Sequence, residues 1–344
     1  MNQCLQKYNQ GRIIHCLSGD MVSGYMVSGH MVSGQSDDAK PFLRKKMNKK
    51  LNSILLSLCI ALLIPATAFS AGKTSTCDTL YPVILAHGTG GADKIMGIVD
   101  YWWGIPDALT DEGAEVYITR VNGLDGTEAK ARQFKAEFLD IQAISGAAKF
   151  NIIAHSHGAL YARYAISNLG LAPYVESLTS IAGPHQGMVL ADLIVEKFPE
   201  PLKPLTGGSL NIVYAYLFGD TNPDSLANVY DVTTDYMQRV FNPHTLNATG
   251  VTYQSWAAKV KTGCPTLVLN PVWRLLRTTE GPNDGLVGVE SAKWGKDCGV
   301  QSAAWWSPGC DHINIIGHLF GITPGFSAPD FYVSIVADLK DQGF

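Results

Sequence analysis

Residues 151–164 read NIIAHSHGALYARY, and their interpretation decides the fold. With Phe150 in front, the first part is an apolar run of the kind that forms a buried strand, and the part from Ala159 onward has the pattern of a helix. Only His155 to Gly158 separate the two. A serine in so short a turn would lie at the carboxyl end of its strand, with its hydroxyl held exposed.

The turn around Ser156 has the features of a nucleophile elbow. Gly158 allows the strand and the helix to approach closely, because it has no side chain. The start of the helix supplies N–H groups and the positive end of a dipole, which favour an oxyanion. Ala154 stands where the usual Gly-x-Ser-x-Gly has its first glycine, and alanine is the next smallest residue. The alternative for an isolated match is a serine that caps a helix.

The sequence LAHGTGG at 85–91 supports the first interpretation. It follows an expected strand, as does the His-Gly loop that supplies the second oxyanion donor in enzymes with such an elbow. The backbone N–H groups of Thr89 and His157 are the two candidate donors. A serine nucleophile also needs an imidazole to take its proton and a carboxylate to orient that imidazole.

The acid and the histidine should follow the serine in that order. Asp284 lies in the sequence GPNDGLVG, where a short acidic side chain can reach inward; an Asx turn is the alternative. His312 lies in PGCDHINIIGH near the end of the chain. His318 competes for the role of base and Asp311 for the role of acid, although an adjacent carboxylate rarely points back at its neighbour's ring.

Apolar runs and helical patterns alternate along the chain. The expected strands are 81–87, 115–120, 150–155, 177–183 and 266–270, and the expected helices are 101–109, a segment with Phe134, Phe138 and Ile141 on one face, 159–170 and 330–340. This alternation predicts an α/β fold with a mostly parallel central sheet flanked by helices. After Gly187 the alternation fades, which indicates an insertion over the carboxyl edge of the sheet.

The first 71 residues differ from the rest. Residues 1–46 contain the repeat MVSGYMVSGHMVSG without core-forming periodicity, which indicates a disordered leader or an upstream start. Residues 47–71 combine a lysine pair, an apolar run and small residues, as a secretory signal peptide does. A membrane anchor is the alternative, but the run is shorter than the roughly 20 residues that span a bilayer. Residues 72–344 would then be one secreted catalytic domain without a stable membrane anchor.

Composition excludes some partners. The formal net charge is -4 and 16% of the residues are charged, so we expect no nucleic-acid partner. Four cysteines follow the signal peptide, and in an oxidising compartment they predict two disulfides with three possible connectivities. His155 and His157 lie two apart across a sharp turn without an evident third ligand, so we expect no zinc site.

Several motifs, taken in order, resemble those of the secreted bacterial lipases of the Pseudomonas and Burkholderia type, which have the α/β-hydrolase fold. They are YPVILAHGTGG (81–91), DYWWGIP (100–106), the His-Ser-His-Gly elbow, IAGPHQG (181–187), NDGLVG (283–288) and the His312 loop. Several motifs in one order are far more specific than any one of them.

The resemblance implies roles for individual residues. Ser156, Asp284 and His312 would form the catalytic triad, and the N–H groups of Thr89 and His157 would form the oxyanion hole. The stretch after Gly187 would include a mobile lid, for which 212–218 is the candidate and an ordinary buried helix the alternative. A dedicated periplasmic folding chaperone is a further implied partner.

The family also holds a structural calcium through an acidic residue upstream of the triad acid and through positions just after the histidine. Here Asn314 and His318 occupy two of those positions, and the residues between Cys264 and Asp284 include no aspartate. Calcium prefers carboxylate and carbonyl oxygens. These differences disfavour the family's structural calcium here, and we expect no required cofactor.

One disulfide is implied in the same way. Cys264 resembles the family's first disulfide cysteine, whereas the position just after NDGLVG is not a cysteine. Cys298 is the next candidate partner, which leaves Cys77 and Cys310 for a second bridge.

Together these residues predict a secreted serine ester hydrolase that acts on acylglycerols at a lipid surface. Tyr101, Trp102 and Trp103 are expected to line an acyl groove, with plain core packing as the alternative. A second hypothesis keeps the triad but takes short soluble esters or polyesters such as polyhydroxyalkanoates. A third, a non-catalytic α/β-hydrolase scaffold, has no physical reason to keep serine, acid and histidine together.

Overall fold

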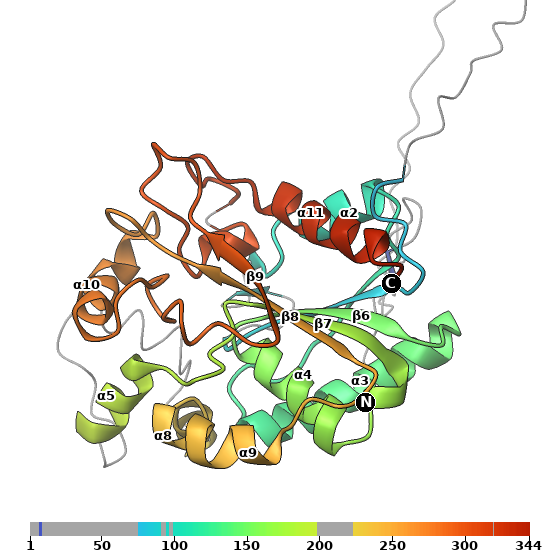
Figure 1. The fold of residues 1–344 in the computed structure, drawn as a ribbon, viewed down its shortest axis with the longest axis horizontal. Coiled ribbons are helices and arrows are strands. Elements are labelled where there is room, and N and C mark those ends of the chain that lie inside the picture. The colour runs from blue at the N-terminus through green and yellow to red at the C-terminus, as the bar shows by residue number, and fades with distance from the viewer. Residues whose placement is uncertain (1–6, 9–74, 91–93, 96–98, 198–222, 319) are drawn as a thin grey trace, which may run out of the picture. The chain divides into compact units, whose positions relative to one another are not determined.

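Parallel strands form the centre of the fold (Figure 1). In spatial order they are β5 (Val116–Ile118), β2 (Val83–Ala86), β6 (Phe150–His155), β7 (Val175–Ile181), β8 (Thr252–Ala258) and β9 (Lys296–Gln301). A two-residue strand, β1 (Lys7–Tyr8), pairs antiparallel with β5, while β3 (Lys94–Ile95) and β4 (Val99–Asp100) form a separate antiparallel pair. The predicted α/β class with a mostly parallel sheet is confirmed.

The structure is a computed structural model that describes residues 7–8, 75–90, 94–95, 99–197, 223–318 and 320–344. The chain divides into two units, of which one comprises 1–14 and 74–344 and contains all the described elements. The expected leader, the signal peptide and the lid candidate 212–218 lie outside the described residues, apart from β1. None of the described helices is long and apolar enough to cross a membrane.

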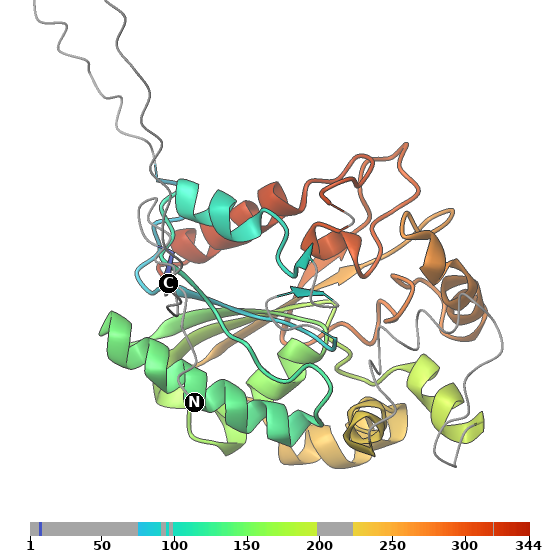
Figure 2. The ribbon, with the colours of Figure 1, turned by 180° about the vertical axis from the view of Figure 1, so that it is seen from behind.

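Helices cover both faces of the sheet. Helices α2 (Ile105–Asp111) and α11 (Ala328–Asp341) lie on one face, and α3 (Thr127–Ser145) and α4 (His157–Asn168) lie on the other, as Figure 1 and the reverse view in Figure 2 both show. The remaining helical segments are η1 (Ala172–Tyr174), α5 (Val189–Lys197), α7 (Pro223–Tyr230), α8 (Thr234–Tyr236), η2 (Met237–Phe241), α9 (Asn242–His244), η3 (Leu267–Leu269), α10 (Asn270–Thr279) and η4 (Asn314–Ile316).

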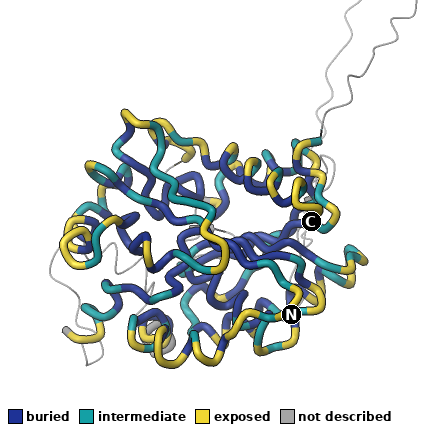
Figure 3. Tube along the Cα trace, in the orientation of Figure 1, coloured by how far each residue is buried: buried dark blue, intermediate teal, exposed yellow. Residues whose placement is uncertain are grey.

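The alternation of side chains along β6 explains why the strand is apolar on both faces. Ile153 belongs to the core beneath α2 and α11, whereas Ile152 and Ala154 belong to the core beneath α3 and α4. Figure 3 shows the central strands buried along their length. Both cores hold β6 in place, so the turn that follows it starts from a fixed position.

One expected strand is wrong. Within 266–270, Thr266 instead caps η3 (Leu267–Leu269), and Asn270 begins α10. Pro271 lies in the first turn of α10, where its fixed φ favours a helix start. The helix expected at 101–109 begins only at Ile105, because Gly104 has the left-handed φ of 68° and Pro106 follows in the first turn.

Candidate active site

Ser156 joins β6 to α4 in a strained turn. Its backbone has φ 56° and ψ -130°, a region that residues with a Cβ rarely adopt. Its N–H donates to the carbonyl of Ile181 at 2.9 Å, which ties the turn to the end of β7. A Cβ at Gly158 would lie 2.9 Å from the carbonyl oxygen of His87 and nearer still to that of Ala86, so only glycine fits there.

The loop after β2 crosses in front of the serine. A Cβ at Gly88 would lie 2.7 Å from Cβ of Ser156 and 2.9 Å from the hydroxyl of Tyr101. The N–H of Gly88 donates to that hydroxyl at 2.9 Å, and the hydroxyl also lies 2.6 Å from Nδ1 of His155. Burial, assisted by the neighbouring His312, lowers the pKa of His155 well below its ordinary value. Tyr101 and a neutral His155 therefore fix the loop against the elbow.

Three side chains that are distant in sequence form one hydrogen-bonded chain. Nε2 of His312 lies 2.9 Å from Oγ of Ser156, and Nδ1 of His312 lies 2.7 Å from Oδ2 of Asp284. The N–H of His312 also donates to the carbonyl of Asp284 at 2.9 Å. His312 and Asp284 are almost fully buried. The structure thus brings together the serine, the imidazole and the carboxylate in the order that nucleophilic catalysis requires.

Asp284 also forms the Asx turn that was the alternative interpretation of its loop. Its Oδ1 accepts hydrogen bonds from the N–H groups of Leu286 at 2.9 Å and Val287 at 2.7 Å, while Oδ2 is left for the imidazole. Because one oxygen anchors the carboxylate in its own loop, the other has a fixed direction towards His312. The Asx turn and the orienting role are the same geometry.

Asp311, the competing acid, points elsewhere. Its carboxylate accepts hydrogen bonds from the N–H groups of Thr266 at 2.7 Å, Ile313 at 3.0 Å and Asn314 at 2.9 Å, and it contacts the Thr266 hydroxyl at 3.2 Å. It joins the loop after β8 to the His312 loop. Its role is to hold the loop that carries the imidazole.

Because the carboxyl of Asp311 is buried, we expect the stability of the protein to depend on pH. Burial raises the pKa of its carboxyl from 3.8 to about 6, even though its hydrogen bonds lower it. The stability that this group contributes is fully present below its unfolded pKa and is lost as the pH rises through about 6. We expect the free energy of unfolding of the parent, relative to Asp311→Asn, to fall between pH 4 and pH 7. Urea unfolding of both proteins across this range measures the difference; a constant difference would contradict the assignment.

The residues at the implied calcium positions do not fit calcium. The side-chain amide of Asn314 donates to the carbonyl of His318, and Nε2 of His318 lies 2.8 Å from the carbonyl oxygen of Asp100. The His318 ring offers nitrogen in place of the oxygen ligands that calcium prefers, and this nitrogen already contacts a backbone carbonyl. Oδ1 of Asn314 is one buried oxygen without a hydrogen-bond partner, too little for a site. In the described part of the chain, no three His, Cys, Asp or Glu side chains gather as metal ligands.

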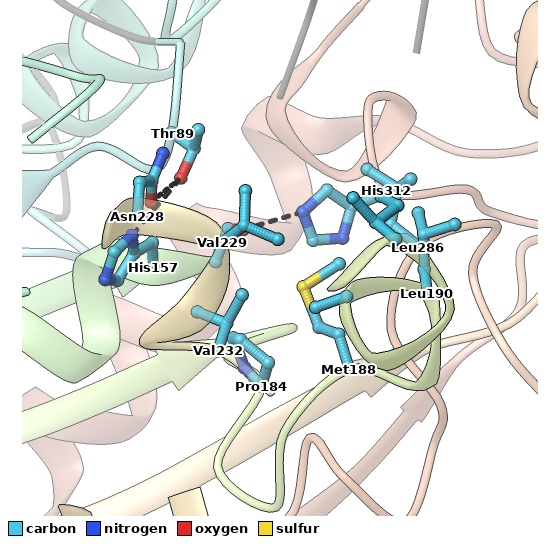
Figure 4. Close-up of a pocket in the computed structure, with 13 residues that line it drawn as sticks. Thr89, His157, Pro184, Met188, Leu190, Asn228, Val229, Val232, Leu286 and His312 are labelled. Atoms are coloured by element: carbon cyan, nitrogen blue, oxygen red, sulfur yellow. Dashed lines mark hydrogen bonds between the residues drawn. The ribbon is translucent and has the colours of Figure 1, made fainter. Parts of the chain in front are cut away.

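An apolar pocket opens beside the serine (Figure 4). Its polar lining consists of Thr89, Ser156, His157, Asn228 and His312, and its apolar lining of Pro184, Met188, Leu190, Ala191, Ile194, Val229, Val232 and Leu286. His157 is the first residue of α4, and the first N–H groups of a helix have no partner within it. The two residues expected to form the oxyanion hole therefore lie next to the serine, at the polar side of the pocket.

Tyr101, Trp102 and Trp103, which were expected to line an acyl groove, do not line this pocket. Tyr101 and Trp102 are buried in the core beneath α2 and α11. The Trp103 ring packs on Phe320, with ring centroids 5.6 Å apart. The alternative of core packing holds for the first two, and Tyr101 in addition anchors the Gly88 loop.

The predicted disulfides are also wrong. Cys77, Cys264, Cys298 and Cys310 are all free thiols. The sulfur of Cys264 lies against Gly285 in the acid loop, whereas the sulfur of Cys298 lies on β9, 3.6 Å from Oε1 of Gln254. A disulfide needs the two Cβ atoms about 4 Å apart, and these side chains are engaged in different parts of the fold.

Comparison with known proteins extends the picture. A family model described as the alpha/beta hydrolase fold matches residues 81–253. A triacylglycerol lipase of Vibrio cholerae is 32% identical over 276 residues, 73% of this chain and 86% of the relative. One from Burkholderia plantarii is 35% identical over 187 residues, 50% of each chain. The crystal structure of a mature Bacillus licheniformis lipase, 20% identical, superposes with a TM-score of 0.57 over 74% of this chain and 91% of that one.

The fold, the elbow and the sheet define an α/β hydrolase, and the chain belongs to that family. Within that family, its similarity to triacylglycerol lipases identifies it as an ester hydrolase of the lipase type. The resemblance to Pseudomonas and Burkholderia lipases that the motifs indicated is confirmed.

Proposed function

We propose that the protein hydrolyses carboxylic esters through an acyl-enzyme on Ser156. His312 takes the proton of the serine hydroxyl as Oγ attacks the ester carbonyl carbon, and the resulting oxyanion accepts hydrogen bonds from the N–H groups of Thr89 and His157. The tetrahedral intermediate collapses as the imidazolium gives its proton to the leaving alkoxide. Water, deprotonated by the same imidazole, then attacks the acyl-enzyme, and the imidazolium returns its proton to Oγ of Ser156 as the acid leaves. No cofactor takes part.

The observation that carries this proposal is the hydrogen-bonded chain from Ser156 through His312 to Asp284, at the wall of an apolar pocket. The side chains of Met188, Leu190 and Leu286 surround the His312 ring in Figure 4. An aliphatic acyl chain beside them would be removed from water, at roughly 0.8 kcal/mol for each buried CH₂ group. We therefore propose acylglycerols, the substrates named for the relatives, as the substrate class.

The experiment is hydrolysis of p-nitrophenyl esters from acetate to palmitate, with and without a calcium chelator. We expect kcat/KM to rise towards long acyl chains and to be the same in chelator. Activity confined to acetate and butyrate would favour an esterase of soluble substrates. Loss of activity in chelator, restored by calcium, would contradict the absence of a cofactor.

An exposed aromatic surface supports a substrate at an interface. Trp305 is 90% exposed and Trp306 60%, and the nearby loop presents Phe320 and Ile322 at 54% and 74%. The N–H of Ala304 donates to the carbonyl of Gly325 at 2.8 Å, which joins the two loops. From 302 to 329 the only ionisable side chains besides Cys310 are Asp311, His312 and His318, and all three are buried. The segment itself carries no exposed charge, and Nζ of Lys261 donates to the carbonyl of Ala304 at 2.6 Å, next to Trp305. Two exposed tryptophans in such a segment suit the boundary between water and lipid.

Trp305→Ser is expected to lower the rate on a tributyrin emulsion several-fold and to leave kcat/KM for p-nitrophenyl acetate unchanged, because only the emulsion requires adsorption. Leu246→Ser, at an exposed leucine of the loop before β8, is the matched control and should change neither rate. Equal rates on the emulsion for Trp305→Ser and its parent would contradict the interfacial role. The rates of Trp305→Ser and its parent on a polyester film would show whether the same surface also adsorbs to a solid substrate.

Secretion and a dedicated folding chaperone are part of the same proposal. The signal-peptide pattern at 47–71 supports export. Fractionation of cells that express the full chain, with amino-terminal sequencing of the exported product, tests both the export and the cleavage near residue 71.

A further inference from the structure

Lys130 is a buried amine that the proposed reaction does not use. It lies on α3 one turn before Phe134, on the face that packs against the sheet, and has no exposed surface. Burial lowers its pKa from 10.5 to about 7, although Asp125 and Asp231 raise it. Among the described residues no carboxylate contacts Nζ directly, and burying an amine without such a contact opposes folding. Its contacts therefore need an explanation other than stability.

The Lys130 amine contacts side chains that line the polar part of the pocket. Nζ lies 3.0 Å from Nδ1 of His157 and 3.3 Å from Oδ1 of Asn228. The hydroxyl of Thr89 lies 3.2 Å from the same Oδ1 and 3.2 Å from the same Nδ1. Figure 4 shows Thr89, Asn228 and His157 grouped together at this end of the pocket. The amine thus links the loop after β2, the start of α4, and α7.

The contacts of its two ring nitrogens fix the tautomer of His157. Asp231 accepts a hydrogen bond from the N–H of Thr127 at 2.7 Å, and the Thr127 hydroxyl lies 2.6 Å from Nε2 of His157. Burial lowers the pKa of His157 well below its ordinary value, so the ring is neutral. The Lys130 ammonium has only donors, so Nδ1 of the neutral ring accepts from it at 3.0 Å, and the ring's proton lies on Nε2, which faces the Thr127 hydroxyl.

We propose that Lys130 is a positioning residue for ester hydrolysis, holding Thr89 and His157 at the separation that the oxyanion requires. This inference rests on the proposed function. His157 supplies one N–H and Thr89 the other, and the amine is tied to the first through the imidazole and to the second through Asn228. Oxyanion donors act only when they are placed for the transition state, and removing one entirely lowers kcat by about 10²–10³-fold.

The test is Lys130→Met, which keeps the length of the side chain and removes its donors. We expect kcat to fall about 10–100-fold with KM changed less than about 2-fold, because the oxyanion forms only in the transition state. Affinity for an alkyl boronic acid, which places an oxygen in the oxyanion hole, should fall with kcat. Lys130→Gln, which retains N–H donors, should recover part of both. The melting temperature of Lys130→Met should stay within a few degrees of the parent.

Lys135→Met is the matched control on the same helix, since its Nζ donates to the carbonyl of Leu169 at 2.7 Å, away from the pocket. It should retain the parent's kcat and KM. A lower melting temperature for Lys130→Met with unchanged kcat and boronate affinity would overturn the proposal and assign Lys130 to stability alone.

Asn228→Ala tests the same link from α7 if Lys130→Met does not fold. We expect the same selective loss of kcat, and parental kcat in this variant would overturn the proposal. Ser156→Ala distinguishes failure of the proposed function from failure of the inference about Lys130. If Ser156→Ala is active, the proposed function fails; if it is inactive while Lys130→Met and Asn228→Ala are fully active, only the present inference fails.

Discussion

Replacing Ser156 with alanine is expected to lower kcat/KM for p-nitrophenyl butyrate by about 10⁵–10⁶-fold, because Oγ is the atom that forms the acyl-enzyme. Alanine fits the turn as well as serine does, since both have a Cβ at the same φ of 56°. The melting temperature should therefore remain close to that of the parent. The measurement is the initial rate of p-nitrophenol release from matched amounts of folded protein. Retention of even a tenth of the parent's rate would contradict the assignment of the nucleophile.

Asp284→Asn is expected to lower kcat by about 10⁴-fold with little change in KM. The N–H groups of Leu286 and Val287 hold Oδ1, so the asparagine oxygen would stay there and its NH₂ group would point at Nδ1 of His312. The ring would then be forced to accept at Nδ1 and to carry its proton on Nε2, facing Ser156. An imidazole in that tautomer cannot take the serine proton. Kinetics of the variant with a soluble ester measure the loss.

Asp311→Asn is the natural control for that experiment. It alters the neighbouring carboxylate of the same loop but leaves the contact between His312 and Asp284 in place. We expect its activity to lie within about tenfold of the parent at a temperature where it is folded. The reverse ranking, with Asp311→Asn inactive and Asp284→Asn active, would make Asp311 the acid.

Local sequence was enough to predict the elbow. Strand, turn and helix are adjacent in the chain, and the need for Gly158 follows from the close approach to β2 that the structure shows. The order of serine, acid and histidine selected Asp284 and His312 from nearby competitors, and the structure brings both to Ser156. Their proximity could be anticipated because each residue lies in a short loop at the carboxyl edge of the sheet.

The same reasoning did not predict the last two strands. β8 reads TYQSWAA and β9 reads KDCGVQ, and neither has the continuous apolar run of the inner strands. β9 pairs with β8 at the edge of the sheet and is partly exposed, so polar residues are tolerated there. In contrast, 266–270 has an apolar run but is followed by a proline that starts a helix.

The polar cluster behind the oxyanion residues depends on contacts between distant segments. Lys130 and Asn228 are 98 positions apart, and no local pattern relates them. One signal was present in the sequence: Lys130 shares its helix face with Phe134, Phe138 and Ile141, where a lysine is out of place. An ionisable residue on an apolar face indicates a buried partner, but only the fold identifies His157 as that partner.

The most direct test of the central claim is labelling of the folded protein with a fluorophosphonate, followed by peptide mapping by mass spectrometry. The reagent phosphonylates a serine only when an adjacent base and oxyanion donors activate it. We expect one label for each protein molecule, on the peptide that contains Ser156, and none in His312→Ala. An unlabelled folded protein, or a label on another serine, would contradict the account of the active site.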